Sequence, residues 1–93
     1  KGYDHCFILN KGQKIAAELS ELETGRLIQI HTDQPGVQLY TGNHLSGVFS
    51  KNQGLCLEAQ HFPNSPNINS FPSTIIKANE DYYSKTSYHF KLL

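Results

Sequence analysis

Three polar residues lie inside short apolar stretches, and their side chains are of the kinds that transfer protons and bind hydroxyl groups. Glu58 lies within GLCLEAQ (54–60), Asp4 stands at the start of an apolar stretch, and Gln38 lies between two apolar residues. A carboxylate can act as a general base. An amide both donates and accepts hydrogen bonds, which suits a sugar hydroxyl. These three residues are therefore the candidates for chemistry.

Solvation explains the same residues without any chemistry. In a strand, Leu57 and Ala59 point one way and Glu58 the other, so Glu58 belongs either to the wet face of an edge strand or to a cleft. Asp4 is equally consistent with a solvated strand end. Three aromatic residues either flank a ligand or pack in a core: Tyr3, Tyr40 and Phe62.

The elements that would position these residues are short strands separated by turns. Gly, Pro and Asn recur at short intervals, and the stretches between them predict strands at residues 3–9, 26–32, 37–41, 55–60 and from 82 onward. A loop rich in Pro and Asn is predicted over 63–72. The pattern predicts an all-β chain.

One segment, residues 13–23, fits two structures. It contains good helix formers, and Ile15, Leu19 and Leu22 have helical spacing. Ile15, Ala17 and Leu19 also alternate as in a strand. The local pattern leaves both structures open.

Composition restricts the size of the chain and its partners. The 93 residues suffice for one small unit with a thin core. The net charge is zero and the lysines are scattered, which argues against nucleic acid or an anionic membrane as a partner. No apolar stretch approaches the ~18 residues of a membrane span. The chain contains no Met, which predicts a fragment or a cleaved product whose targeting signals are out of view.

The cysteines and histidines predict neither a disulfide framework nor a metal site. Cys6 and Cys56 are far apart and are expected to be free thiols, which suits the reducing cytoplasm. The five histidines show no HxH or HExxH spacing. No phosphate-binding glycine loop or GxSxG motif is present.

Four segments taken together resemble the C-terminal part of the aldose 1-epimerase (galactose mutarotase) family. They are GYDHCFIL (2–9), QPGVQLYTGNHLSG (34–47), GLCLEAQHFPNSPN (54–67) and FPSTIIKANEDYYSKTSYHF (71–90). The resemblance covers nearly the whole chain. It implies that residues 1–93 are one piece of a larger antiparallel β-sandwich whose N-terminal part is absent. It also implies that residues 15–20 of the ambiguous segment form one strand of a hairpin.

The resemblance implies an activity and site residues. The family interconverts the α and β anomers of hexoses such as galactose and glucose, without a metal or organic cofactor. The Glu of its C-L-E motif, here Glu58, is the general base. The Asp of G-x-D-H and the Gln of P-G-V-Q, here Asp4 and Gln38, hold sugar hydroxyls.

The matching region lacks part of the family's catalytic machinery. The family's general-acid histidine, a second histidine and an arginine lie upstream, so the lone chain is expected to have little or no activity. Asn64 stands where the family usually has Asp, and Ala78-Asn79 replaces Pro-Gly. Two alternative functions stay open: a non-catalytic carbohydrate-binding β module, and a glycosidase that uses Asp4 and Glu58 as a carboxylate pair.

Overall fold

The chain forms two three-stranded antiparallel sheets, and a computed structural model describes all of residues 1–93. The first sheet, sheet A, has the order β1-β4-β5 and the second, sheet B, has the order β2-β3-β6. The strands are β1 (Asp4–Ile8), β2 (Ala17–Glu21), β3 (Arg26–Thr32), β4 (Gly36–Tyr40), β5 (Cys56–Gln60) and β6 (Thr86–Leu92). The only helical element is a single 3-10 turn, η1 (Ser65–Asn67), inside the predicted loop. The predicted all-β antiparallel class is confirmed.

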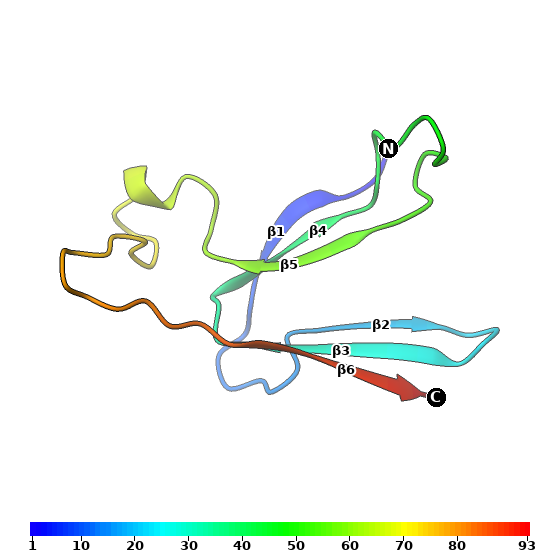
Figure 1. The fold of residues 1–93 in the computed structure, drawn as a ribbon, viewed down its shortest axis with the longest axis horizontal. Coiled ribbons are helices and arrows are strands. Elements are labelled where there is room, and N and C mark those ends of the chain that lie inside the picture. The colour runs from blue at the N-terminus through cyan, green and yellow to red at the C-terminus, as the bar shows by residue number, and fades with distance from the viewer.

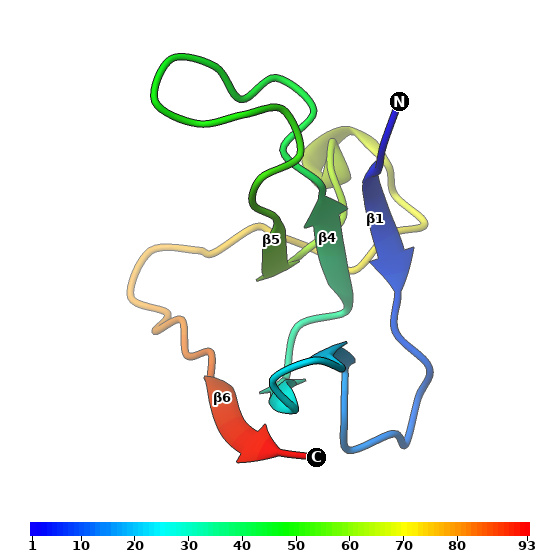
Figure 2. The same cartoon turned by 90° about the vertical axis from the view of Figure 1, so that its right-hand side faces the viewer.

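The two sheets form a wedge that is open at one end. Figure 1 shows them close together near the connection from β3 to β4 and separated at the opposite end. Figure 2 shows β1, β4 and β5 side by side, with β6 apart from them. The radius of gyration is 15.7 Å, whereas a compact domain of this length has a value of about 12 Å. The arrangement is part of a β-sandwich whose layers are incompletely covered.

The segment that fitted both helix and strand forms β2 because it pairs with β3. Ala17 lies opposite Ile30 and Leu19 opposite Ile28. The hairpin turn carries Gly25 at φ 70°, a conformation that favours glycine. Hydrogen bonds from the Thr24 hydroxyl and from two turn N–H groups hold the pKa of the Glu21 carboxyl below its usual value. Cross-strand pairing therefore overrides the helix propensity of this segment.

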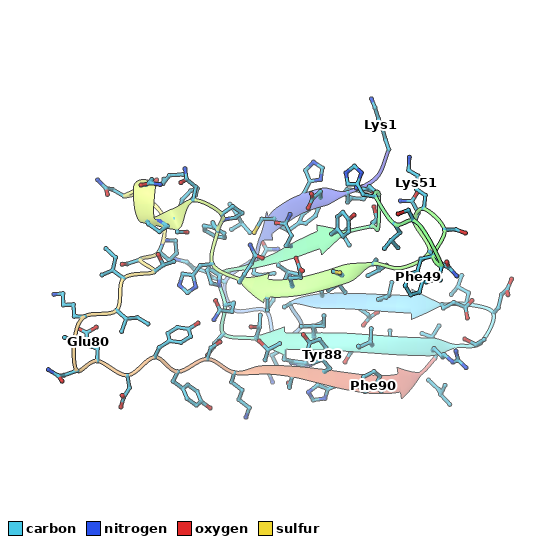
Figure 3. The ribbon with its side chains drawn as sticks, turned by 45° about the horizontal axis from the view of Figure 1, so that its top comes forward. Lys1, Phe49, Lys51, Glu80, Tyr88 and Phe90 are labelled. Carbon is cyan, nitrogen blue, oxygen red and sulfur yellow. The ribbon has the colours of Figure 1, made fainter.

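The core is small and lies where the sheets approach each other. Only 6 of 93 residues are buried, and the apolar ones among them are Ile30 of β3 and Val37 of β4. By contrast, Tyr88 and Phe90 follow each other along the outer strand β6 and are exposed (Figure 3). The apolar face of sheet B is therefore largely uncovered.

A polar cluster joins the end of β3 to the residues that follow β5 and precede β6. Gln34 Nε2 donates to the Tyr82 hydroxyl at 2.7 Å and to Ser84 Oγ at 2.6 Å. Its Oε1 lies 2.8 Å from His61 Nδ1, and because an amide oxygen only accepts, Nδ1 carries the proton. Ser84 Oγ in turn donates to Asp33 Oδ1 at 2.8 Å. The cluster ties sheet A to sheet B.

The cluster also explains where β6 begins. The strand predicted from residue 82 starts at Thr86 instead. Tyr82 and Ser84 are hydrogen-bonded to Gln34 rather than extending the sheet. No helix in the chain has the length and apolar content needed to span a membrane.

Shortening Ile30 tests the small core. Ile30 is 1 % exposed, so Ile30→Val should lower the free energy of unfolding by about 0.5–1.5 kcal/mol through the lost methyl group and the cavity left behind. The measurement is urea unfolding followed by circular dichroism. Val48 is 92 % exposed, so the control Val48→Ala should change stability by less than about 0.5 kcal/mol. Equal effects of the two substitutions would contradict this placement of the core.

Acid should weaken the polar cluster through Asp33. Hydrogen bonds from the Ser84 hydroxyl and the Lys85 N–H lower the pKa of the Asp33 carboxyl from its usual 3.8. A lowered folded-state pKa contributes stability above the unfolded-state value, and that stability is lost as the pH falls through the folded-state value. The melting temperature should therefore fall below about pH 4, and it should fall less in Asp33→Asn.

The control for this titration is Asp81→Asn, because the Asp81 side chain makes no hydrogen bond. It should keep the full loss of melting temperature between pH 7 and pH 3. A loss that is identical in all three proteins would show that Asp33 does not contribute to acid sensitivity.

Candidate functional site

The three candidate residues lie on one face of sheet A. Gln38 of β4 lies directly opposite Cys6 of β1 on one side and opposite Glu58 of β5 on the other. Asp4 lies two residues before Cys6, and residues two apart in a strand share a face. Asp4, Gln38 and Glu58 therefore belong to one surface, which we call the polar face of sheet A. It is completed by the other alternating residues of the three strands, which are Cys6, Ile8, Gly36, Tyr40, Cys56 and Gln60.

Asp4 and Gln38 are joined directly. Gln38 Nε2 donates to Asp4 Oδ1 over 2.8 Å. Because an ionised carboxylate only accepts hydrogen bonds, this contact fixes the orientation of the amide, with Nε2 towards Asp4. The other amide atom, Gln38 Oε1, is buried and has no hydrogen-bond partner. Asp4 and Glu58 are both exposed, so the face presents two carboxylates, one on either side of a fixed amide.

An aromatic side chain closes one end of the polar face. Gly36 has no side chain, and a Cβ built there would lie 2.9 Å from the Phe62 ring and 3.0 Å from Cys6 Sγ. Phe62 thus lies over the glycine, and its ring meets Phe71 edge to face at 5.1 Å between centroids. Gly36 lies just outside the strand predicted over residues 37–41, and its contact with Phe62 depends on a loop that follows another strand.

The other two aromatic candidates differ in position. Tyr40 lies on the polar face, opposite Asp4, and its hydroxyl accepts the His44 N–H at 3.1 Å. The Tyr3 ring instead contacts His5 and Phe7, which point to the opposite face of β1. Tyr40 and Phe62 therefore border the candidate site, and Tyr3 does not.

The polar face lies outside the main cavities of the chain. None of the five principal cavities of the chain is lined by Asp4, Gln38 or Glu58. None of the five histidines occupies a register position on this face. The chain also contains no group of three or more His, Cys, Asp or Glu side chains close enough together to hold a metal ion. The face can bind hydroxyl groups and accept a proton, but a second proton-transfer group is not on it.

Comparison with known proteins identifies the family. The family model described as aldose 1-epimerase matches residues 1–89. The chain belongs to the aldose 1-epimerase family. It is 39% identical to the galactose mutarotase of Mus musculus, in an alignment that covers 98% of this chain and 30% of that protein. It is 35% identical to the aldose 1-epimerase of Escherichia coli K12, over 97% of this chain and 30% of that protein.

The relatives that the chain matches are much longer than the chain itself. The chain spans about 30% of the length of the curated relatives that it matches. Membership of the aldose 1-epimerase family agrees with the resemblance carried by the sequence motifs, and with a partial β-sandwich that leaves its layers uncovered.

The two cysteines of the polar face should differ in reactivity. Cys56 is exposed, whereas Cys6 is half-buried and desolvation raises the pKa of its thiol. Because the thiolate is the nucleophile, iodoacetamide at pH 8 should alkylate Cys56 at least about tenfold faster than Cys6. Peptide mass spectrometry at timed intervals measures both rates. Equal rates would show that Cys6 is not shielded from solvent, and Cys56→Ser provides the control that isolates Cys6.

Proposed function

We propose that this chain is a segment of an aldose 1-epimerase that interconverts the α and β anomers of hexoses such as galactose and glucose. The observation that carries the proposal is the common face of Asp4, Gln38 and Glu58, with the 2.8 Å hydrogen bond from Gln38 to Asp4. Membership of the aldose 1-epimerase family supports it independently. Residues 1–93 act as a single unit of a larger domain, which we place in the cytoplasm.

Each of the three residues has a role in the proposed reaction. Opening a hexose ring requires removal of the proton from the anomeric hydroxyl while the ring oxygen is protonated. Glu58 is the general base that removes the proton, since its exposed carboxylate is free to approach a hydroxyl. Asp4 and Gln38 hold sugar hydroxyls so that the anomeric oxygen meets Glu58. Rotation about one bond and reclosure then give either anomer.

The fixed amide suits such a positioning role. Gln38 Nε2 already donates to Asp4, so the Asp4 carboxylate is held beside an amide whose second N–H can donate to a hydroxyl. Two side chains that are already held together lose less conformational freedom on binding than two independent side chains. The neighbouring Phe62 and Tyr40 give the polar face an aromatic border against which the C–H groups of a sugar ring can pack.

The remainder of the fold is the partner that this proposal requires. The reaction needs a general acid, and no histidine occupies the polar face of sheet A. Several large apolar side chains are exposed, including Tyr88, Phe90 and Leu92 on β6. Exposed apolar strands of this kind are usually covered in a complete sandwich. We therefore assign the missing acid and the missing cover to the part of the domain that precedes this segment, and expect the isolated chain to have little or no activity.

A chimera tests the proposal. Residues 1–93 replace the matching segment of the mouse galactose mutarotase, and polarimetry measures glucose anomer exchange. In the chimera, Glu58→Gln should lower kcat by about 10²- to 10⁴-fold and leave KM nearly unchanged, because the amide keeps the shape of the carboxylate but cannot accept the proton. Asp4→Asn should mainly raise KM.

Glu18→Gln is the matched control. Glu18 is an exposed carboxylate within a strand, like Glu58, but it lies in sheet B and accepts a hydrogen bond from Gln29. Its substitution should leave the rate unchanged. A folded chimera with near-wild-type exchange after Glu58→Gln would reject the role of Glu58. A chimera that binds the sugar without exchanging its anomers would favour a non-catalytic carbohydrate-binding module.

A further inference from the structure

Two imidazole rings lie side by side on sheet B, on the face that carries its polar side chains. His31 of β3 and His89 of β6 have ring centroids 4.4 Å apart, with their planes inclined by 46°. His31 lies opposite Ser87 in the β3–β6 register, and His89 lies opposite Gln29. The two histidines are therefore diagonal neighbours on one face, the arrangement in which side chains on adjacent strands reach each other.

The ring of His89 is turned along its strand towards the position of His31. Its Nε2 lies 3.1 Å from Ser87 Oγ, and Ser87 is the residue directly opposite His31. The Nε2 atom of His89 thus points into the space that the His31 ring also borders. A neutral imidazole nitrogen that is not protonated is an acceptor and a metal ligand.

The separation of the rings matches that of two imidazoles bound to one metal ion. A metal–nitrogen bond of ~2.1 Å places each ring centroid about 3.2 Å from the metal. Two such rings have centroids about 4.5 Å apart at a right angle around the ion, and about 5.2 Å apart at the tetrahedral angle that Zn²⁺ prefers. The observed 4.4 Å is close to the first value and less than about 1 Å below the second. Rotation of the two rings, rather than a large shift of either strand, would therefore be needed to bring one nitrogen of each to a common ion.

The surrounding groove leaves room for further ligands. His31, Ser87 and His89 line a cavity of about 460 Å³, together with Lys14, Asp33 and Lys85. The Asp33 carboxylate is already hydrogen-bonded to Ser84 and to the Lys85 N–H. Water molecules would complete the coordination, with the Ser87 hydroxyl as a hydrogen-bond partner for one of them. The two lysines oppose a cation, so the site should be exchangeable rather than permanently filled.

We propose that His31 and His89 form a two-imidazole chelate for a divalent transition-metal ion. Imidazole ligands suit copper, nickel and zinc, and the general order of affinity places Cu²⁺ above Ni²⁺ and Zn²⁺. The site lies on sheet B and is independent of the polar face of sheet A. The histidines are 58 positions apart in the sequence, so no local spacing motif reveals the pair.

Nuclear magnetic resonance of the imidazole groups tests the chelate without any substitution. Zn²⁺ alone is titrated into the 93-residue chain and into the chimera described above, at pH 7.5. The signals of His31 and His89 should shift together and saturate at one Zn²⁺ per chain, while those of His5 and His44 stay in place. Following the histidines individually separates this event from binding to the thiols. Saturated zinc binding in both proteins without a joint shift of His31 and His89 would overturn the proposal, as would the absence of binding.

Single substitutions then measure the chelate. His31→Gln and His89→Gln should each weaken Zn²⁺ binding at least about tenfold, since each removes one arm of a two-arm ligand. His44→Gln is the matched control, because His44 is exposed in a loop and pairs with no other ring. Affinity that is unchanged in both test variants would likewise overturn the proposal.

Discussion

The position of β4 between β1 and β5 is the constraint on which the candidate site depends. Side chains alternate along a strand, so a shift of one residue in either pairing would move Gln38 to the face opposite Asp4 or Glu58. The register that places Gln38 opposite both Cys6 and Glu58 also puts Gly36 on the same face, where its missing side chain leaves room for the Phe62 ring. The apolar pattern of β4 supports this register, because Val37 is buried on the opposite face. Core packing and site geometry are thus set by the same pairing.

Alternation along the chain predicted most strands to within a few residues, because each half-buried strand shows its own period of two. β3 matches its predicted range, and the bounds of β1, β4 and β5 differ from theirs by at most one residue. The ambiguous segment around β2 could not be decided locally, since Ile15, Ala17 and Leu19 satisfy both periods. Its pairing with β3 depends on contacts along the hairpin that a pattern in one strand does not contain. β6 starts late because Tyr82 and Ser84 bind Gln34, a contact across 48 and 50 residues.

The candidate site was predictable as residue types but not as a geometry. Glu58, Asp4 and Gln38 stand out because each is polar in an apolar setting, and the family resemblance gave each a role. The three residues share a face only because β4 pairs with both β1 and β5. β1 and β4 are separated in the sequence by β2 and β3, so a local pattern does not reveal this pairing. The same reason hides the His31–His89 pair and the contact of Gly36 with Phe62. Long-range pairing creates all three, whereas sequence patterns report mainly local preferences.

The short connection from β3 to β4 controls the angle between the two sheets. Each sheet is stiffened by its own ladder of hydrogen bonds, so any change of angle between them must occur close to Asp33 and Gln34. A small rotation there becomes a large displacement at the far ends of a body 48 Å long. The hydrogen bonds of Gln34 to Tyr82, Ser84 and His61 lie within this connection, where they restrain the angle between the sheets. A few side-chain hydrogen bonds at that point therefore set the spacing into which the rest of a sandwich must fit.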